Sequence, residues 1–267
     1  MSIFEAILLG VVEGLTEYLP VSSTGHLVLV SHWLGHEAEA SAAFDIVIQL
    51  GAILAVLVHY RVLLAERASG LFKRDEKAVR LLVALALGFL PAAVTGLLFR
   101  KWIKAHLFGP LPIAGALIVG GLVMIASDRL MRNRQGSVDS LEDVTPKRAL
   151  IIGFSQCLAM WPGASRSMCT ILGGQVAGLT TRAAAEFSFL LGLPTLGAAA
   201  LYEAYKSRDV LATGGLVPIV VGLVVSFFVA WAVVAVFIRY LQKRGLAPFG
   251  LYRIALGLIV IFAVVRA

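Results

Sequence analysis

Long apolar segments dominate this 267-residue chain and restrict it to folds that sit in a bilayer. A helix of roughly 20 apolar residues crosses a hydrocarbon core about 30 Å thick while satisfying its own backbone hydrogen bonds. The chain is 59% hydrophobic and 15% charged, with a mean hydropathy of +0.90, unlike soluble domains. We therefore expect a single all-α polytopic membrane domain over residues 1–267. The six candidate transmembrane helices are residues 41–59, 81–99, 111–131, 183–202, 215–238 and 248–265.

Two polar blocks interrupt this apolar sequence: EGLTEYLPVSSTGH at residues 13–26 and QCLAMWPGASRS at residues 156–167. Each contains a proline, which removes a backbone donor and disfavours helix just before it. The flanking segments are too short or too polar for a comfortable span, so we expect two re-entrant helical hairpins. The predicted hairpins cover residues 3–19 and 21–36, broken at Pro20, and residues 147–161 and 163–178, broken at Pro162 and Gly163.

Loop charges predict the orientation of the chain. Most Lys and Arg residues fall in the loops 60–80, 128–148 and 239–247, which the positive-inside rule assigns to the cytoplasm. Both termini and the entry of the first hairpin are then outside, and the second hairpin enters from the cytoplasm. These loop cations also explain the net charge of +7 without a nucleic-acid partner. Fewer cations fall on the opposite side: Arg100, Lys101, Lys104, Lys206, Arg208 and Arg266.

A weak internal duplication relates residues 1–132 to residues 147–267 across a cytoplasmic loop. Each half has one hairpin and three spans, and an odd number of spans inverts the second copy relative to the first. Chance similarity between apolar segments is the alternative, but the matching order of elements and the charge pattern favour an inverted-topology repeat. At an offset of 143 the aligned pairs are Ala6/Ala149, Gly10/Gly153, Leu15/Leu158, Tyr18/Trp161 and Phe44/Phe187, and a one-residue slip pairs Pro20/Pro162 and Ser23/Ser165.

The first polar block combines acids, hydroxyls and an imidazole. Glu13 and Glu17 lie one helical turn apart and would repel each other unless a cation or a proton lay between them. Hydroxyl residues then begin the next helix, where free backbone donors favour an anion, and His26 follows one turn later. These groups suit activation of water or a hydroxyl against a phosphate.

The second block supplies a guanidinium. Ser165 and Ser167 flank Arg166 at another predicted helix start, a setting that suits a fork for phosphate oxygens. If the two hairpin tips meet, the acids, the hydroxyls, the imidazole and Arg166 share one polar pocket. Asp45 and Gln49, one turn apart in the first span, are weaker candidates for the pocket wall. Arg253 lies near a span end, where we expect a snorkelling or structural role.

The two motifs, with the surrounding spans and basic loops, closely resemble the bacterial undecaprenyl-diphosphate phosphatases of the bacitracin-resistance family, essentially end to end. The resemblance implies a hydrolase of the bacterial inner membrane that converts undecaprenyl diphosphate to undecaprenyl phosphate and inorganic phosphate for peptidoglycan synthesis. It also implies a divalent cation, Mg or Ca. The entry side of the first hairpin separately predicts a site open to the outer side. Membrane lipids and a second copy of the chain, in a possible homodimer, are the other expected partners.

The family's motifs carry over onto this chain residue by residue. They imply catalytic roles for Glu17, Ser23, His26 and Arg166, and metal binding by Glu13 and Glu17. The implied phosphate-binding residues are Ser22, Thr24, Gly25, Gly163, Ser165, Arg166 and Ser167. The nucleophile stays open between Ser23, which we favour, His26 and water.

Other readings of the same residues are simpler or belong to other classes of protein. The serines and Thr24 could serve only as helix caps. Inverted repeats with broken helices also occur in secondary transporters, so a carrier or flippase for a lipid phosphate or anion is the main alternative. An intramembrane serine protease is weaker, because the chain lacks a GxSxG elbow and a protease has no use for the acid pair or the arginine.

Overall fold

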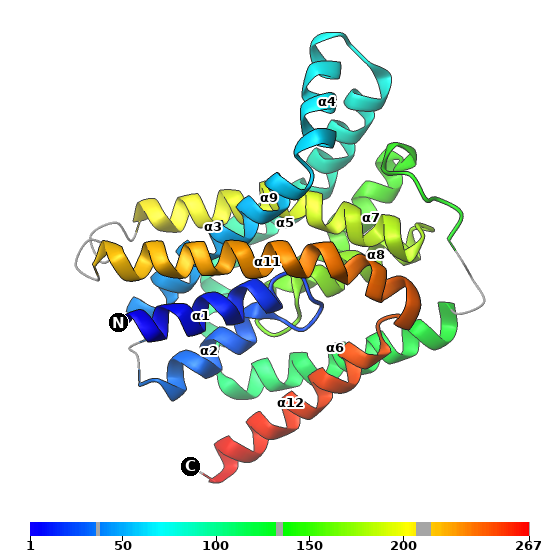
Figure 1. The fold of residues 1–267 in the computed structure, drawn as a ribbon. Coiled ribbons are helices and arrows are strands. Elements are labelled where there is room, and N and C mark those ends of the chain that lie inside the picture. Colours follow the sequence, from blue (N-terminus) through cyan, green and yellow to red (C-terminus); the bar gives the residue numbers. More distant parts are fainter. Residues whose placement is uncertain (36–37, 132–135, 207–214, 267) are drawn as a thin grey trace.

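The structure is a computed structural model that describes residues 1–267 except 36–37, 132–135, 207–214 and 267. The described residues are almost entirely helical (Figure 1). The helices in chain order are α1 (Ile3–Thr16), α2 (Ser23–Trp33), α3 (Ala38–His59), α4 (Arg61–Phe72), α5 (Glu76–His106), α6 (Pro110–Met131), α7 (Pro146–Cys157), α8 (Arg166–Val176), α9 (Thr181–Lys206), α11 (Leu216–Arg244) and α12 (Ala247–Arg266), with 3₁₀ turns at Leu141–Asp143 and Leu158–Met160.

The chain is a multi-pass membrane protein with five or six candidate spans. Helices α5, α6, α9, α11 and α12 are each long and apolar enough to cross a membrane. Helix α3 meets the same test only together with α4, to which it is joined through a 72° bend, either a broken span or a re-entrant loop. Each of the six segments predicted from the sequence coincides with one of these helices.

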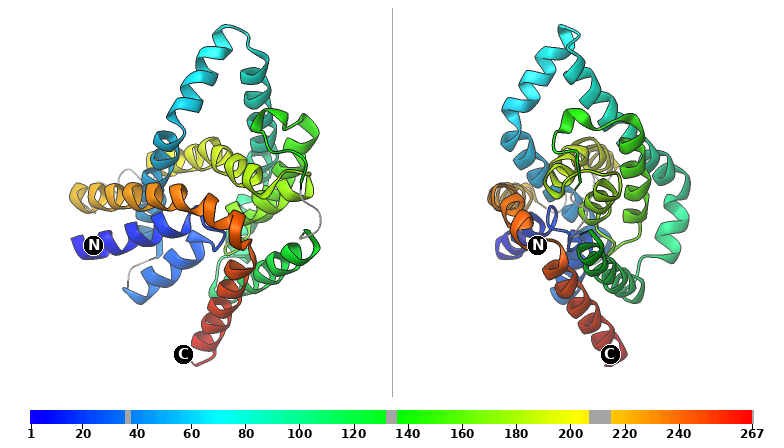
Figure 2. Two further views of the ribbon diagram at one scale, coloured as in Figure 1. Left: turned by 45° about the vertical axis from the view of Figure 1, so that its right-hand side comes forward. Right: turned by 90° about the vertical axis from the view of Figure 1, so that its right-hand side faces the viewer.

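The segment 60–80, predicted as a loop, is largely helical instead. It contains α4 and the first turns of α5. None of the α4 side chains is buried, and α4 projects from the bundle with the start of α5 (Figures 1 and 2). Leu, Ala, Arg and Glu are good helix formers, so α4 forms without a buried face. The Lys and Arg residues of this segment indicated only that it does not cross the membrane.

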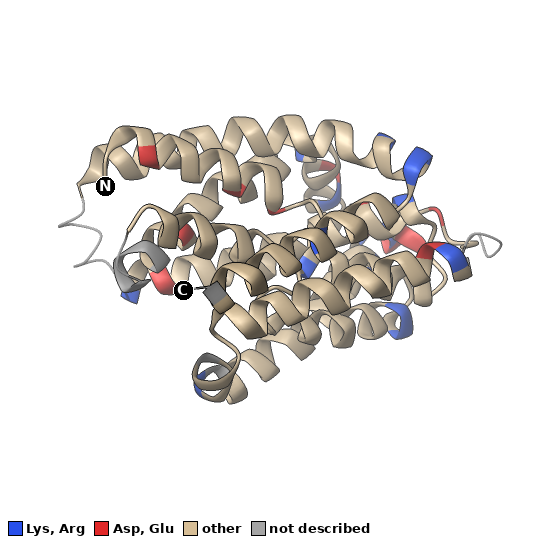
Figure 3. Ribbon diagram, turned by 90° about the horizontal axis from the view of Figure 1, so that it is seen from below, with Lys and Arg blue, Asp and Glu red and all other residues tan. Residues whose placement is uncertain are grey.

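Charged residues are unevenly distributed along the bundle. Lys and Arg gather mainly at the end away from the N-terminus, and a few acids and cations lie between the helices (Figure 3). Of the loop cations considered above, Arg132, Arg134 and Arg208 lie outside the described residues.

The two polar blocks form helix–turn–helix hairpins, α1–α2 and α7–α8. The second helix of each hairpin begins after a serine with positive φ, Ser22 at 74° and Ser165 at 72°. Each serine hydroxyl accepts a bond from a backbone N–H three residues on, at 3.3 Å. Such a backbone costs about 1–3 kcal/mol and persists only where surrounding contacts hold it. Ser22 and Ser165 thus hold the same position in the two hairpins, whereas the sequence alignment with its one-residue slip paired Ser165 with Ser23.

Each hairpin packs against a long helix from the other half of the sequence. Helix α1 lies on α11, where a Cβ at Gly10 would sit 2.6 Å from the carbonyl oxygen of Gly222. Helix α7 lies on α5, where a Cβ at Gly153 would sit 2.6 Å from the carbonyl oxygen of Gly88. Glycine is required at both crossings because the backbones touch, as is usual where membrane helices pack closely.

Arg253 of α12 joins the two hairpin turns. Its side chain is fully buried, so the sequence-based option of snorkelling is wrong and a structural role is correct. The carbonyls that accept from its guanidinium belong to Pro20 (3.1 Å), Gly163 (2.7 Å), Ala164 (3.1 Å), Ala116 (3.0 Å) and Leu117 (3.3 Å). Carbonyls in a turn have no helical partner, and Arg253 supplies the donors that water cannot provide there.

We predict that Arg253→Met lowers the free energy of unfolding by about 3–5 kcal/mol, because several buried carbonyls lose charged donors together. Thermal unfolding of the purified protein in detergent measures the change. The control is Arg182→Met, which removes a half-exposed ion pair with Glu186 and should cost less than about 1 kcal/mol. Equal unfolding midpoints for the two variants would contradict the role assigned to Arg253.

Candidate active site

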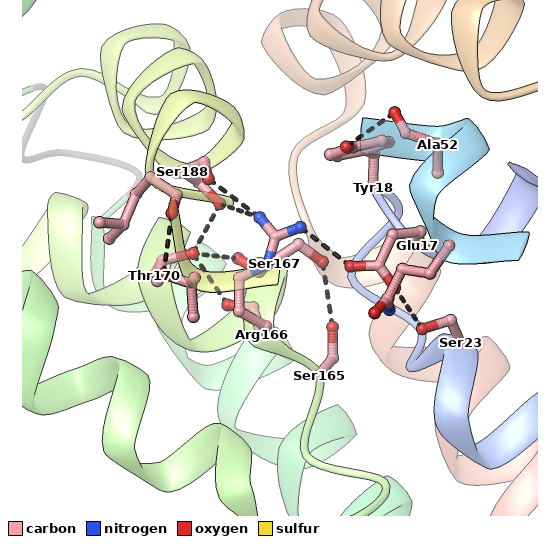
Figure 4. Close-up of polar contacts among 12 residues, drawn as sticks. Glu17, Tyr18, Ser23, Ala52, Ser165, Arg166, Ser167, Thr170 and Ser188 are labelled. Carbon is pink, nitrogen blue, oxygen red and sulfur yellow. Dashed lines mark hydrogen bonds and ion pairs between the residues drawn. The ribbon is translucent and has the colours of Figure 1, made fainter. Parts of the chain in front are cut away.

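The tips of the two hairpins meet and form a buried polar cluster (Figure 4). Nη2 of Arg166 lies 2.9 Å from Oε1 of Glu17, and both side chains are nearly inaccessible to solvent. Beside them, the Ser167 hydroxyl donates to the carbonyl of Leu19 at 2.9 Å. The structure therefore brings the acidic motif and the arginine motif together, as the sequence reasoning required.

Glu17 is the centre of this cluster. Besides Arg166, its carboxylate accepts from the Ser23 hydroxyl at 2.5 Å and from Nε2 of Gln49 at 3.1 Å. A serine hydroxyl that donates to a buried carboxylate has a proton acceptor in place, which is the arrangement of a nucleophile beside its general base. Gln49, proposed from the sequence as part of the pocket wall, thus touches the site directly.

Arg166 is held from three sides. Its Nη1 donates to the carbonyl of Ser188 at 2.9 Å, and its guanidinium lies 5.5 Å from the ring centroid of Tyr18 (Figure 4). The Thr170 hydroxyl bonds to both the Arg166 carbonyl (2.8 Å) and the Ser188 hydroxyl (2.6 Å). Nε of Arg166 is buried without a partner among the described residues. The guanidinium is thus rigidly placed, and its Nε–H is left for a further acceptor.

Glu13 differs sharply from Glu17. Its side chain is fully buried, and neither carboxylate oxygen has a hydrogen-bond partner among the residues described. Glu17 and Asp45 lie near enough to interact with it electrostatically. A buried carboxylate without donors needs a proton or a cation, so Glu13 fits the cation expected from the sequence. Within the described ranges, no group of three or more His, Cys, Asp or Glu side chains is arranged to hold a metal.

Neither ring nitrogen of His26 bonds to Ser23 or Glu17. Its Nδ1 lies 2.7 Å from the Ser22 carbonyl oxygen, and its Nε2 lies 2.6 Å from the Tyr252 hydroxyl. Of Glu17 and His26, only Glu17 bonds to the Ser23 hydroxyl in this structure.

The remaining residues of the two motifs mainly shape the hairpin turns. Ser165 caps α8 and bonds to the Ser167 hydroxyl at 3.0 Å, while Ser22 caps α2 through the backbone N–H of Gly25. Gly163 has a φ of 95° and supplies a carbonyl to Arg253. Thr24 is exposed at the start of α2.

Comparison with known proteins shows which family the chain belongs to. The family described as "Bacitracin resistance protein BacA" matches residues 6–259, nearly the whole chain. The chain belongs to this family. The resemblance inferred from the two motifs is therefore confirmed.

Several relatives carry the name undecaprenyl-diphosphatase. A protein of Sorangium cellulosum is 61% identical over 250 residues, which cover 92% of this chain and 81% of that protein. A protein of Aromatoleum aromaticum is 47% identical, covering 91% of this chain and 88% of its own length. A protein of Ectopseudomonas mendocina is 45% identical, covering 92% and 88%.

Sequence reasoning missed four residues that contact the site of this family member. Thr170 had a usable signal, because it lies one turn after Arg166 on the same helix. Tyr18 lies inside the first polar block, directly after Glu17, but no local pattern indicates its contact with Arg166. Ser188 and Tyr252 had no signal, because each reaches the site from an apolar stretch and its role depends on how helices pack. Tyr18 donates its hydroxyl to the Ala52 carbonyl at 2.9 Å, which fixes the ring near Arg166.

We predict that Tyr18→Leu lowers phosphate release by about tenfold, because it removes the ring beside the Arg166 guanidinium. Tyr18→Phe keeps that ring and loses only the bond to Ala52, so it should mainly lower stability, by about 1 kcal/mol. Phosphate-release kinetics and thermal unfolding of both variants separate the two effects. Equal losses of activity would show that the ring has no effect on Arg166.

Proposed function

We propose that this chain is an undecaprenyl-diphosphatase, which hydrolyses undecaprenyl diphosphate to undecaprenyl phosphate and inorganic phosphate. This activity recycles the lipid carrier for peptidoglycan synthesis and confers bacitracin resistance. The observation that carries the proposal is the buried contact of Glu17 with both Ser23 and Arg166, where the two hairpin tips meet. The names of the relatives support the same substrate.

Ser23 is the proposed nucleophile. Its oxygen attacks the terminal phosphorus while its proton passes to Glu17, and the bond from that phosphorus to the bridging oxygen breaks. Undecaprenyl phosphate leaves, and water then hydrolyses the phosphoserine to release inorganic phosphate and restore the hydroxyl. The alternatives are His26 or water as nucleophile, and the Ser23–Glu17 bond favours Ser23 over both.

Arg166 is the proposed phosphate clamp. Phosphoryl transfer depends mainly on positioning and on neutralising charge on the phosphate oxygens. Nε has no partner among the described residues, and Nη2 could exchange the Glu17 carboxylate for a phosphate oxygen. Ser165 and Ser167 hold the start of α8, so they place Arg166 and the nearby backbone donors.

The expected Mg or Ca ion would be held by Glu13 together with Glu17. The unpartnered Glu13 carboxylate is the structural support for this assignment, since Glu17 already accepts from Arg166, Ser23 and Gln49. A bound divalent cation would offset negative charge on the diphosphate.

We further propose that the protein lies in the bacterial inner membrane as an inverted repeat of six spans and two re-entrant hairpins, with its site open to the outer side. The matching serine caps and the paired glycine crossings of α1 on α11 and α7 on α5 support the repeat. The distribution of loop cations supports the orientation. An anion carrier or lipid flippase remains the alternative, because broken helices that meet inside a bundle also build transport sites.

Purified protein in detergent should release inorganic phosphate from undecaprenyl diphosphate. We predict that Arg166→Ala and Ser23→Ala each lower kcat by at least about 100-fold, because they remove the clamp and the nucleophile. Ser165→Ala and Ser167→Ala should cost less than about tenfold, because they alter only the support of Arg166. Near-normal turnover of Arg166→Ala would show that Arg166 is not the phosphate clamp.

Two further arms complete this assay. Chelator should abolish release by the wild type, and Glu13→Gln should raise the concentration of Mg or Ca needed to restore it. Binding or flux of the lipid without any phosphate release would support the carrier instead.

Labelling of single cysteines tests the orientation. We predict that Thr24→Cys, in a background with both Cys157 and Cys169 replaced by alanine, reacts in intact cells with an impermeant thiol reagent from the outer side, since Thr24 is exposed at the first hairpin. The control is Lys243→Cys, at an exposed position in the last turn of α11, which should react only after the cytoplasmic side is opened. The reverse pattern would overturn the outward-facing site.

A further inference from the structure

His26 is held at both ring nitrogens. Its Nδ1 lies 2.7 Å from the backbone oxygen of Ser22, on its own helix. Its Nε2 lies 2.6 Å from the hydroxyl of Tyr252, which is 226 residues away on α12. The two rings are nearly parallel, with planes 4° apart and centroids 5.6 Å apart. An imidazole with both nitrogens engaged has little freedom to rotate.

These partners decide which nitrogen can accept a proton. A carbonyl oxygen can only accept, so Nδ1 of His26 carries the hydrogen in this contact. In the neutral ring Nε2 then has the lone pair and accepts from the Tyr252 hydroxyl. In the protonated ring Nε2–H donates to that hydroxyl oxygen instead. The tyrosine can therefore keep the imidazole in one place in either protonation state.

The next residue of α12 fixes where this hydroxyl lies. Arg253 donates to carbonyls of both hairpin turns. One of them belongs to Pro20, just before the helix that carries Ser23 and His26. Tyr252 is consequently anchored to the same turn through the backbone of its neighbour. Helix α12 thus sets the distance between the Tyr252 hydroxyl and the first hairpin.

We propose that Tyr252 is a positioning residue for the phosphatase reaction, which acts by holding Nε2 of His26 in one orientation through the catalytic cycle. This inference rests on the proposed function and on the catalytic role that the family motif implies for His26, because it matters only if His26 takes part in the reaction. A catalytic group held by a hydrogen bond from a rigid helix loses less in reorientation on reaching the transition state. Tyr252 itself need not touch the substrate.

A merely structural tyrosine would behave differently. About half of the Tyr252 side chain is exposed, so removing its hydroxyl leaves the ring contact intact and creates no cavity. A structural role would change the stability of the protein and would be independent of His26. A positioning role would change kcat, leave KM alone and disappear when His26 is absent.

The test is a double-mutant cycle built on Tyr252→Phe and His26→Ala, with phosphate release from undecaprenyl diphosphate as the readout. We expect Tyr252→Phe to lower kcat by about threefold to tenfold, the effect of one lost hydrogen bond, with KM unchanged. In the His26→Ala background the same substitution should have no further effect. The matched control is Tyr240→Phe on α11. The Tyr240 ring packs on Phe249, and loss of its hydroxyl should leave kcat unchanged.

Three results would overturn the proposal. The first is an unchanged kcat in Tyr252→Phe. The second is an equal loss of kcat from Tyr252→Phe in the wild-type and His26→Ala backgrounds. The third is a change in kcat no larger than that of Tyr240→Phe. Full activity of His26→Ala would instead show that His26 takes no part in the reaction, and would overturn the positioning role with it. An inactive His26→Ala beside a fully active Tyr252→Phe would overturn the positioning role alone.

A spectroscopic readout gives a second test that does not depend on turnover. In protein labelled with ¹⁵N histidine, the Nε2 resonance of His26 should shift in Tyr252→Phe and stay in place in Tyr240→Phe. An identical Nε2 resonance in wild type and Tyr252→Phe would show that the hydroxyl does not hold the ring, and would overturn the proposal.

Discussion

The buried guanidinium of Arg253 is the interaction on which the rest of the site depends. A chain that breaks two helices inside an apolar bundle leaves turn carbonyls without helical partners and without water. Arg253 donates to carbonyls of both turns and of α6 at once, so it satisfies these groups and joins the turns in the same step. Its own charge is stabilised by those carbonyl dipoles, which makes the arrangement mutually required.

Once the turns are joined, the two hairpins divide the chemistry. Both use a serine with positive φ as the cap of the second helix, so both aim the following residue in a comparable way. In the first hairpin that residue is Ser23 and in the second it is Arg166, and the two side chains converge on opposite oxygens of Glu17. The same backbone conformation therefore places a hydroxyl on one side of the Glu17 carboxylate and a guanidinium on the other.

Much of the fold and part of the site could be predicted from local patterns. The six apolar segments, the breaks at Pro20 and Gly163 and the serine caps all follow from residues adjacent in the sequence. Helix α4 was missed because a charged segment with good helix propensity reads as a loop when hydropathy is the criterion. Glu13 and Glu17 looked equivalent as a pair one turn apart, yet their environments are opposite. Glu17 accepts three hydrogen bonds from side chains, whereas Glu13 has no partner among the described residues.

By itself, the sequence determined that this protein lies in a membrane, that two of its helical segments are broken and polar, and which family it belongs to. Composition, proline positions and contiguous motifs carry that information. Only the tertiary structure decided that Arg166 pairs with Glu17, that Glu17 and not His26 receives the Ser23 hydrogen bond, and that Tyr252 holds His26. Arg166 and Glu17 lie 149 residues apart, and Tyr252 and His26 lie 226 apart. No local pattern encodes such contacts, because they depend on how the helices of the two halves cross and on the rotation of each helix about its axis.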